Sequence, residues 1–108
     1  NERSEDNRKH IERLAHRLER YPGYHITVEG HTSKVHWDDP AKGDEEQRDV
    51  LIPLSQARAE AVMGALVELG IERTRLTAVG KGGLEPLVPF SERDEQWRNR
   101  RVEFVLTR

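Results

Sequence analysis

The stretch LSQARAEAVMGALVELG, residues 54–70, decides which fold this sequence can adopt. Its apolar residues repeat at helical spacing and form one stripe that can be buried: Ala59, Val62, Met63, Leu66 and Leu69. Ser55 is suited to cap the start of this helix, and Gly70 stands where a left-handed glycine would end it. The sequence therefore predicts a core helix over residues 55–69.

Arg58 falls in the first turn of this predicted helix, where free backbone N–H groups favour an anion. Its guanidinium is a planar fork that can hold a carboxylate with two parallel hydrogen bonds. On pattern alone Arg58 is a solvent-exposed helix residue. The segments HITVEGHTS before the helix and NRRVEF near the C-terminus favour the anion site.

The composition limits the class of protein. The 108 residues are 34% hydrophobic and 35% charged, which suits a single domain over residues 1–108 with a modest core. The net charge of −2 argues against bulk attraction to nucleic acid or anionic lipid. The chain has no cysteine, so disulfides and thiolate metal sites are excluded. No apolar run approaches membrane-spanning length, and we expect no membrane insertion.

The order of the predicted elements indicates an α/β (α+β) fold. Period and breaker residues predict a helix at 1–20, strands at 24–32, 75–80 and 102–106, and a short helix at 91–97. This order predicts a small mixed sheet with the helices over residues 5–19 and 55–69 packed on one face. Three strands make a narrow sheet, so we expect a first strand upstream of this chain.

Residues 33–53 are expected to form a long charged loop and the most exposed or mobile part of the domain. The segment carries many acids: Asp38, Asp39, Asp44, Glu45, Glu46 and Asp49. It lacks the regular oxygen spacing of a calcium loop. The turn at residues 80–83 lacks the Ser or Thr of a phosphate loop, because Leu84 follows. We therefore expect no metal site and no cofactor.

Four short motifs in this order resemble the OmpA-like C-terminal domain, the module that anchors outer-membrane proteins and lipoproteins to peptidoglycan. They are YHITVEGHT at 24–32, LSQARA at 54–59, Gly80-x-Gly82 followed by Pro86, and NRRVE at 99–103. The resemblance implies an α/β sandwich, a peptidoglycan stem as partner, and a periplasmic domain associated with the outer membrane.

The resemblance also implies a ligand site made of Thr32, Ser33, Arg58, Asn99 and Arg101. In the family, the arginine at the Arg58 position holds the carboxylate of the diaminopimelate side chain. An aspartate directly after the Gly-His-Thr turn holds its amine, and this chain has Ser33 there. An asparagine usual three residues before the Leu-Ser pair is Leu51 here.

The serine at position 33 leaves two functional hypotheses open. Losing the charged partner of a desolvated pair costs ~2–5 kcal/mol, so binding of the stem should be weak unless Asp38 or Asp39 takes over. A wall with lysine or ornithine at this stem position lacks the carboxylate that suits Arg58. The domain is therefore either a peptidoglycan binder with a degraded or altered site, or a degenerate fold used as a structural or protein-interaction domain in the envelope.

The sequence does not favour nucleic-acid binding or catalysis. The basic residues around Trp97 could suggest an RNA surface, but the net charge is negative, and we expect no nucleic-acid partner. No nucleophile is paired with a base, so we expect no enzyme. His31 is interpreted as a structural, hydrogen-bonding residue of the turn, since His25, His31 and His36 do not share a face at ligand spacing.

Overall fold

The computed structural model describes the backbone of residues 2–108 and the side chains of residues 8–108. Asn1, where the predicted first helix begins, lies outside the described residues. The elements are α1 (Glu2–Glu19), β1 (His25–His31), α2 (Pro40–Glu46), a π-helical segment (Gln47–Leu51), α3 (Ile52–Glu68), β2 (Leu76–Gly82) and β3 (Arg101–Thr107). Short 3₁₀ turns at Arg73–Arg75 and Arg93–Arg98 precede β2 and β3.

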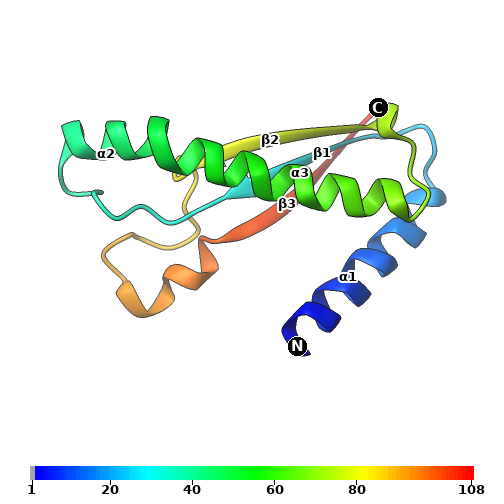
Figure 1. The fold of residues 1–108 in the computed structure, drawn as a ribbon, viewed down its shortest axis with the longest axis horizontal. Coiled ribbons are helices and arrows are strands. Elements are labelled where there is room, and N and C mark those ends of the chain that lie inside the picture. The colour runs from blue at the N-terminus through cyan, green and yellow to red at the C-terminus, as the bar shows by residue number, and fades with distance from the viewer. Residues whose placement is uncertain (1) are drawn as a thin grey trace.

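The sheet has the strand order β2-β1-β3, with β1 parallel to β2 and antiparallel to β3. Ile26 and Val28 of β1 are fully buried in one core with Ala15 of α1 and Ala59 of α3. Figure 1 shows both helices on the same side of the sheet. The predicted α+β sandwich and the placement of both helices on one face are therefore confirmed.

The predicted stripe of the core helix is confirmed except at its end. Ala59 and Leu66 are buried, and Val62 and Met63 pack against the core. Leu69 remains 38% exposed because α3 ends at Glu68. Gly70 has φ +102°, in the left-handed region, as predicted for the residue that closes the helix.

The prediction of a long loop at 33–53 is wrong, because most of this segment is helical. α2 begins at Pro40, and the Asp39 side chain caps it by accepting a hydrogen bond from Lys42 N at 3.1 Å. The Glu46 carboxylate accepts hydrogen bonds from the backbone N–H groups of Val35 and His36 and so fastens the short turn before α2. One continuous helix thus runs over Pro40–Glu68.

Pro53 is the reason why the sequence pattern placed the helix start too late. Proline removes one backbone donor and clashes with the preceding turn of an ordinary helix. The π-helical segment ends at Leu51, two residues before Pro53, with Ile52 N bonded to Gln47 O. Ser55 is consequently inside the helix and is not its N-cap, and Arg58 is not in a first turn. The helix-terminus argument for an anion at Arg58 is therefore wrong.

The Pro40–Glu68 helix is long and apolar enough, by length and composition alone, to cross a membrane. This differs from the expectation that no segment approaches such a length. In this fold Ser55, Ala59 and Leu66 are buried, and α3 packs on β1 and β2. The helix therefore serves as the core helix of the domain.

The core helix lies against the sheet at two glycines. A Cβ on Gly30 would overlap the Ser55 carbonyl oxygen, and a Cβ on Gly80 would lie 2.7 Å from Ile52 O. Polar side chains complete the contact: Ser55 Oγ accepts from Gly82 N at 2.9 Å, and Gln56 bonds both Gly80 N and Ala78 O. Only residues without side chains at 30 and 80 allow this close approach.

Arg75 joins the end of α1 to the sheet. Its guanidinium donates to the carbonyl oxygens of Leu18 (3.3 Å), Tyr21 (2.7 Å) and Tyr24 (3.2 Å), which follow one another around the turn into β1. Leu18 O and Tyr21 O also accept hydrogen bonds from Tyr21 N and Tyr24 N, so Arg75 adds a charged donor to carbonyl oxygens at the end of the helix.

We expect Arg75→Ala to lower the free energy of unfolding by about 1.5–3 kcal/mol, the range for hydrogen bonds to charged groups. Denaturant titration measures it. The exposed Arg73→Ala serves as the matched control, with a change within about 0.5 kcal/mol. Equal effects of the two substitutions would contradict the role of Arg75.

Candidate functional site

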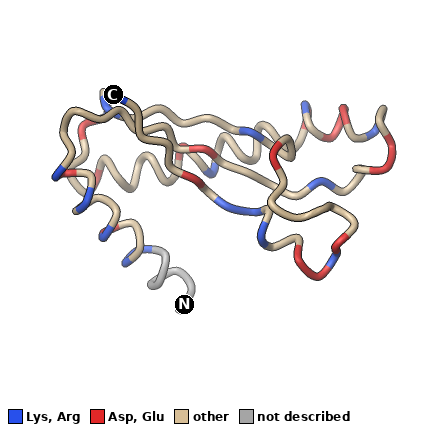
Figure 2. The backbone as a smooth tube through the Cα atoms, turned by 180° about the vertical axis from the view of Figure 1, so that it is seen from behind, with Lys and Arg blue, Asp and Glu red and all other residues tan. Residues whose placement is uncertain are grey.

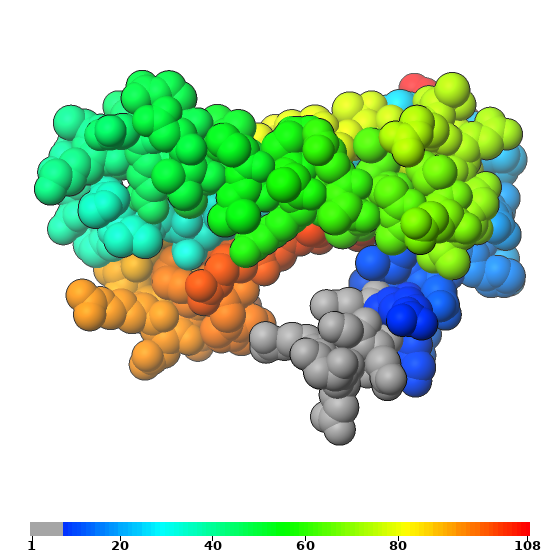
Figure 3. All heavy atoms as spheres, in the orientation of Figure 1, coloured from blue at the N-terminus to red at the C-terminus, as the bar shows by residue number. Residues whose placement is uncertain are grey.

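A cavity of about 740 Å³ opens between α1, α3 and the segment that leads into β3. Figure 3 shows this hollow on the face that carries the helices. Basic side chains line it: His10, Arg58, Arg100 and Arg101. Apolar residues make up the rest of the lining: Ile11, Val62, Trp97, Val102 and Phe104.

Among the residues whose side chains are described, the charge of the cavity lining is positive. No acidic residue lines it among residues 8–108, and within the same range the Arg58 guanidinium has no hydrogen-bond or ion-pair partner. Figure 2 shows the run of basic residues where the 93–98 turn leads into β3. An exposed guanidinium above an apolar floor can hold a carboxylate attached to an aliphatic group.

The Arg101 side chain, at the edge of the cavity, is hydrogen-bonded mainly to backbone carbonyl oxygens. Its guanidinium donates to Asn99 O at 3.3 Å and Glu85 O at 2.9 Å, and it pairs with the Glu103 carboxylate at 3.2 Å. These contacts commit most of its donors to the fold. Arg101 therefore connects the loop after β2 to β3 more than it offers a free cation.

Asn99 is a structural residue of the loop between β2 and β3. It is fully buried, and its side-chain oxygen accepts from Leu87 N at 2.8 Å and Val88 N at 3.1 Å. Its amide donates to Val88 O and to the Gln96 side chain. All four hydrogen bonds of the amide group are thus used inside the protein.

Thr32 and Ser33 lie at the end of β1 and do not line the cavity. Thr32 is 3% exposed, its backbone N–H bonds Gly82 O at 2.9 Å, and Ser33 is half-buried. Of the residues carried over by resemblance, the cavity thus brings together Arg58 and Arg101. It includes neither Thr32, Ser33 nor Asn99.

The position of Asp39 excludes it as a replacement for the missing acid. Asp39 caps α2, and Arg58 lies nineteen residues further along the same continuous helix. At about 1.5 Å per residue, the two are roughly 28 Å apart along the helix axis. Asp38 precedes Asp39 in the turn before that helix. Neither acid can therefore complete the Arg58 cavity.

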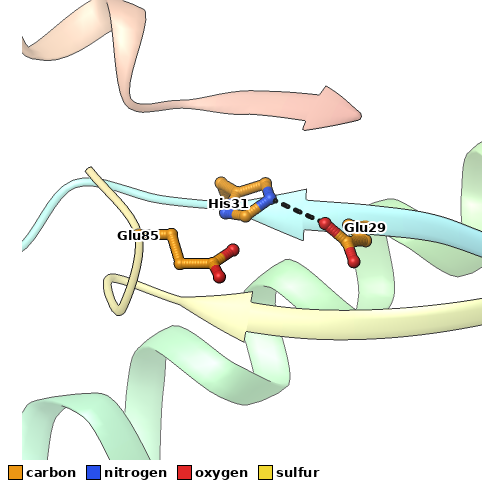
Figure 4. A group of neighbouring side chains, drawn as sticks. All are labelled: Glu29, His31 and Glu85. Carbon is orange, nitrogen blue, oxygen red and sulfur yellow. Dashed lines mark ion pairs between the residues drawn. The ribbon is translucent and has the colours of Figure 1, made fainter. Parts of the chain in front are cut away.

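A second group of polar side chains lies on the opposite face of the sheet; of its members the sequence indicated only His31, and as a structural residue. Glu29, His31 and Glu85 bring potential metal-ligand atoms within 4.8 Å of one another (Figure 4). The pattern Glu29-x-His31 on a strand is the signal that could have indicated it, because alternate residues share one face. Glu85 comes from an irregular segment, and no local pattern places it there.

Comparisons with known proteins support the resemblance. A model of the OmpA family matches residues 4–100. Outer membrane porin F of Pseudomonas aeruginosa is 37% identical over 94 residues, which cover 86% of this chain and 24% of that protein. Peptidoglycan-binding protein ArfA of Mycobacterium bovis is 30% identical over 96 residues, 89% of this chain and 26% of that protein.

The peptidoglycan-associated lipoprotein from Burkholderia pseudomallei has a similar crystal structure, with a TM-score of 0.76 and 26% identity over 94% of this chain and 78% of that one. Fold and motifs thus define an α+β domain of the peptidoglycan-associating class. The chain belongs to the OmpA family. It spans about a quarter of the length of the two curated relatives above.

We expect Asn99→Ala to loosen the 84–98 segment and to lower the free energy of unfolding by ~2–4 kcal/mol, because it leaves buried backbone groups unpaired. Arg98→Ala, at the exposed neighbouring position, is the control and should change stability little. Thermal and denaturant unfolding measure both variants. A change in stability by Asn99→Ala as small as that of Arg98→Ala would contradict the structural role of Asn99.

Proposed function

We propose that this domain associates non-covalently with peptidoglycan through the Arg58 cavity, and that it holds the carboxylate half of the stem's diamino acid far better than the ammonium half. The observation that carries the proposal is the Arg58 guanidinium in a cavity lined by basic and apolar side chains. Membership of the OmpA family supplies the class of ligand.

The carboxylate half has a suitable partner. Arg58, Arg100 and His10 line the cavity, and both arginines carry a guanidinium that can bind a carboxylate. Val62 and Phe104 provide apolar surface for the aliphatic chain that carries the carboxylate. In the absence of the helix-terminus effect, the guanidinium groups alone supply the positive charge.

The ammonium half lacks a charged partner. Ser33 offers a hydroxyl acceptor without charge, and its side chain lies outside the cavity lining. Asp39 is occupied as a helix cap. A lost charge partner costs ~2–5 kcal/mol, which weakens binding by roughly thirtyfold to a few thousandfold.

We also propose that the domain is a non-catalytic module of the cell envelope. Porin F is named as an outer-membrane protein, and ArfA as a peptidoglycan-binding protein. Ser55, the serine of the family motif, is buried and bonded to Ile52 O and Gly82 N. It serves the fold and is not a nucleophile paired with a base.

A structural or protein-interaction role is the second candidate. It is favoured by the internal bonds of Asn99 and Arg101, which leave two of the carried-over residues occupied by the fold. In that case the domain would present its charged surface to an envelope protein and would not bind the stem.

Calorimetric titration with a diaminopimelate-containing stem peptide separates the two candidates. We expect the wild type to bind weakly and Arg58→Ala to lose at least about tenfold in affinity. Because Ser33 lies outside the cavity lining, Ser33→Asp should gain affinity only where the bound stem reaches from the cavity to the end of β1. Arg13→Ala on the outer face of α1 is the matched control and should bind as the wild type does.

Two outcomes would overturn the proposal. Tight binding by the wild type that Arg58→Ala leaves unchanged would place the ligand elsewhere on the domain. No binding by either the wild type or Ser33→Asp, with both folded by circular dichroism, would support the structural or interaction role.

A further inference from the structure

The face of the sheet that carries no helix holds a cluster of charged side chains at the end of β1. Ile26 and Val28 point into the core, so Glu29 and His31 point to the other face. Glu103 of β3 pairs directly with Glu29 across the strands, and Glu85 reaches the same place from the segment after β2. Figure 4 shows Glu29 and Glu85 on either side of the His31 ring.

His31 is the unusual member of this cluster. Its side chain is 1% exposed, yet neither Nδ1 nor Nε2 has a hydrogen-bond partner among the residues whose side chains are described. The interpretation of His31 as a hydrogen-bonding turn residue is therefore wrong. A buried imidazole is costly when its nitrogens make no hydrogen bond, and here Nε2 has only ion-pair contacts with two carboxylates.

Two of the carboxylates, those of Glu29 and Glu103, lie at distances from His31 that suit a shared ion. Nε2 is 3.5 Å from Glu29 Oε1 and 3.1 Å from Glu103 Oε2, without hydrogen-bond geometry. Zinc binds nitrogen and oxygen ligands at about 2.0–2.1 Å, so two ligands of a tetrahedral site stand roughly 3.3 Å apart. The two observed distances lie on either side of this value.

The cluster also has more carboxylates than basic groups, which favours a bound cation. Glu29 and Glu103 are directly opposite on neighbouring strands, an arrangement in which like charges repel. Lys81 approaches Glu29 only to 3.9 Å, and Arg101 pairs with Glu103 at 3.2 Å. With Glu85, the carboxylates outnumber these two basic groups by one.

We propose that Glu29, His31 and Glu85 bind a zinc ion, with Glu103 beside them as a further carboxylate. Mixed imidazole and carboxylate ligands suit zinc, whereas magnesium and calcium prefer oxygen ligands alone. The ion would give His31 a direct ligand bond in place of its present contacts with the carboxylates. The bound zinc ion would also link the segment that carries Glu85 to the end of β1.

Zinc titration of the metal-free domain by calorimetry tests this proposal. We expect one saturable site in the wild type and a rise in melting temperature on zinc addition, because the ion binds the folded state. Glu85→Gln, on the exposed segment, should weaken zinc binding by about tenfold or more without loss of the fold. Glu92→Gln in the same segment is the matched control and should bind as the wild type does.

Cobalt substitution gives a second readout, since a tetrahedral site produces strong visible absorption that Glu85→Gln and Glu29→Gln should abolish. Absence of saturable zinc binding by the wild type would overturn the proposal. Equal binding by the wild type and Glu85→Gln would also overturn it, because the ion would then bind at other histidines.

Discussion

The close contact between the Pro40–Glu68 helix and β2 is the constraint on which the rest of this structure depends. Gly30 and Gly80 let the helix backbone touch the sheet. Gln47, Ser55 and Gln56 then bond the backbone of β2 and of Gly83. An edge strand normally leaves donors and acceptors exposed, and here side chains of the helix satisfy them. This contact sets the position of α3 on the sheet. It therefore determines where the exposed Arg58 side chain and the cavity lie.

Most of the fold could be predicted because its signals are local. The stripe in α3, the alternation in β1 and the glycine at 70 each indicate their own conformation. The helical start at Pro40 could not be predicted, because Pro53 argues for a break in any ordinary helix. The π-helical segment that accommodates this proline has no local sequence signature.

The candidate site could be predicted only in part. Arg58 was identified by its motif, and the structure places it in a basic cavity. The residues that line the cavity together with Arg58 could not be predicted, because His10 and Trp97 come from segments far apart in sequence. Asn99 and Arg101 carry the family pattern, but their bonds inside the fold depend on the irregular 84–98 segment. The Glu29, His31 and Glu85 cluster was missed for the same reason.

Amide hydrogen exchange measured by NMR tests the helix-to-β2 contact most directly. The account predicts that the amides of Gly80, Gly82 and Gly83 exchange as slowly as those of β1, because side chains of the helix accept their hydrogen bonds. It also predicts slow exchange over Gln47–Leu51. Rapid exchange at these glycines, with β1 still protected, would contradict the account.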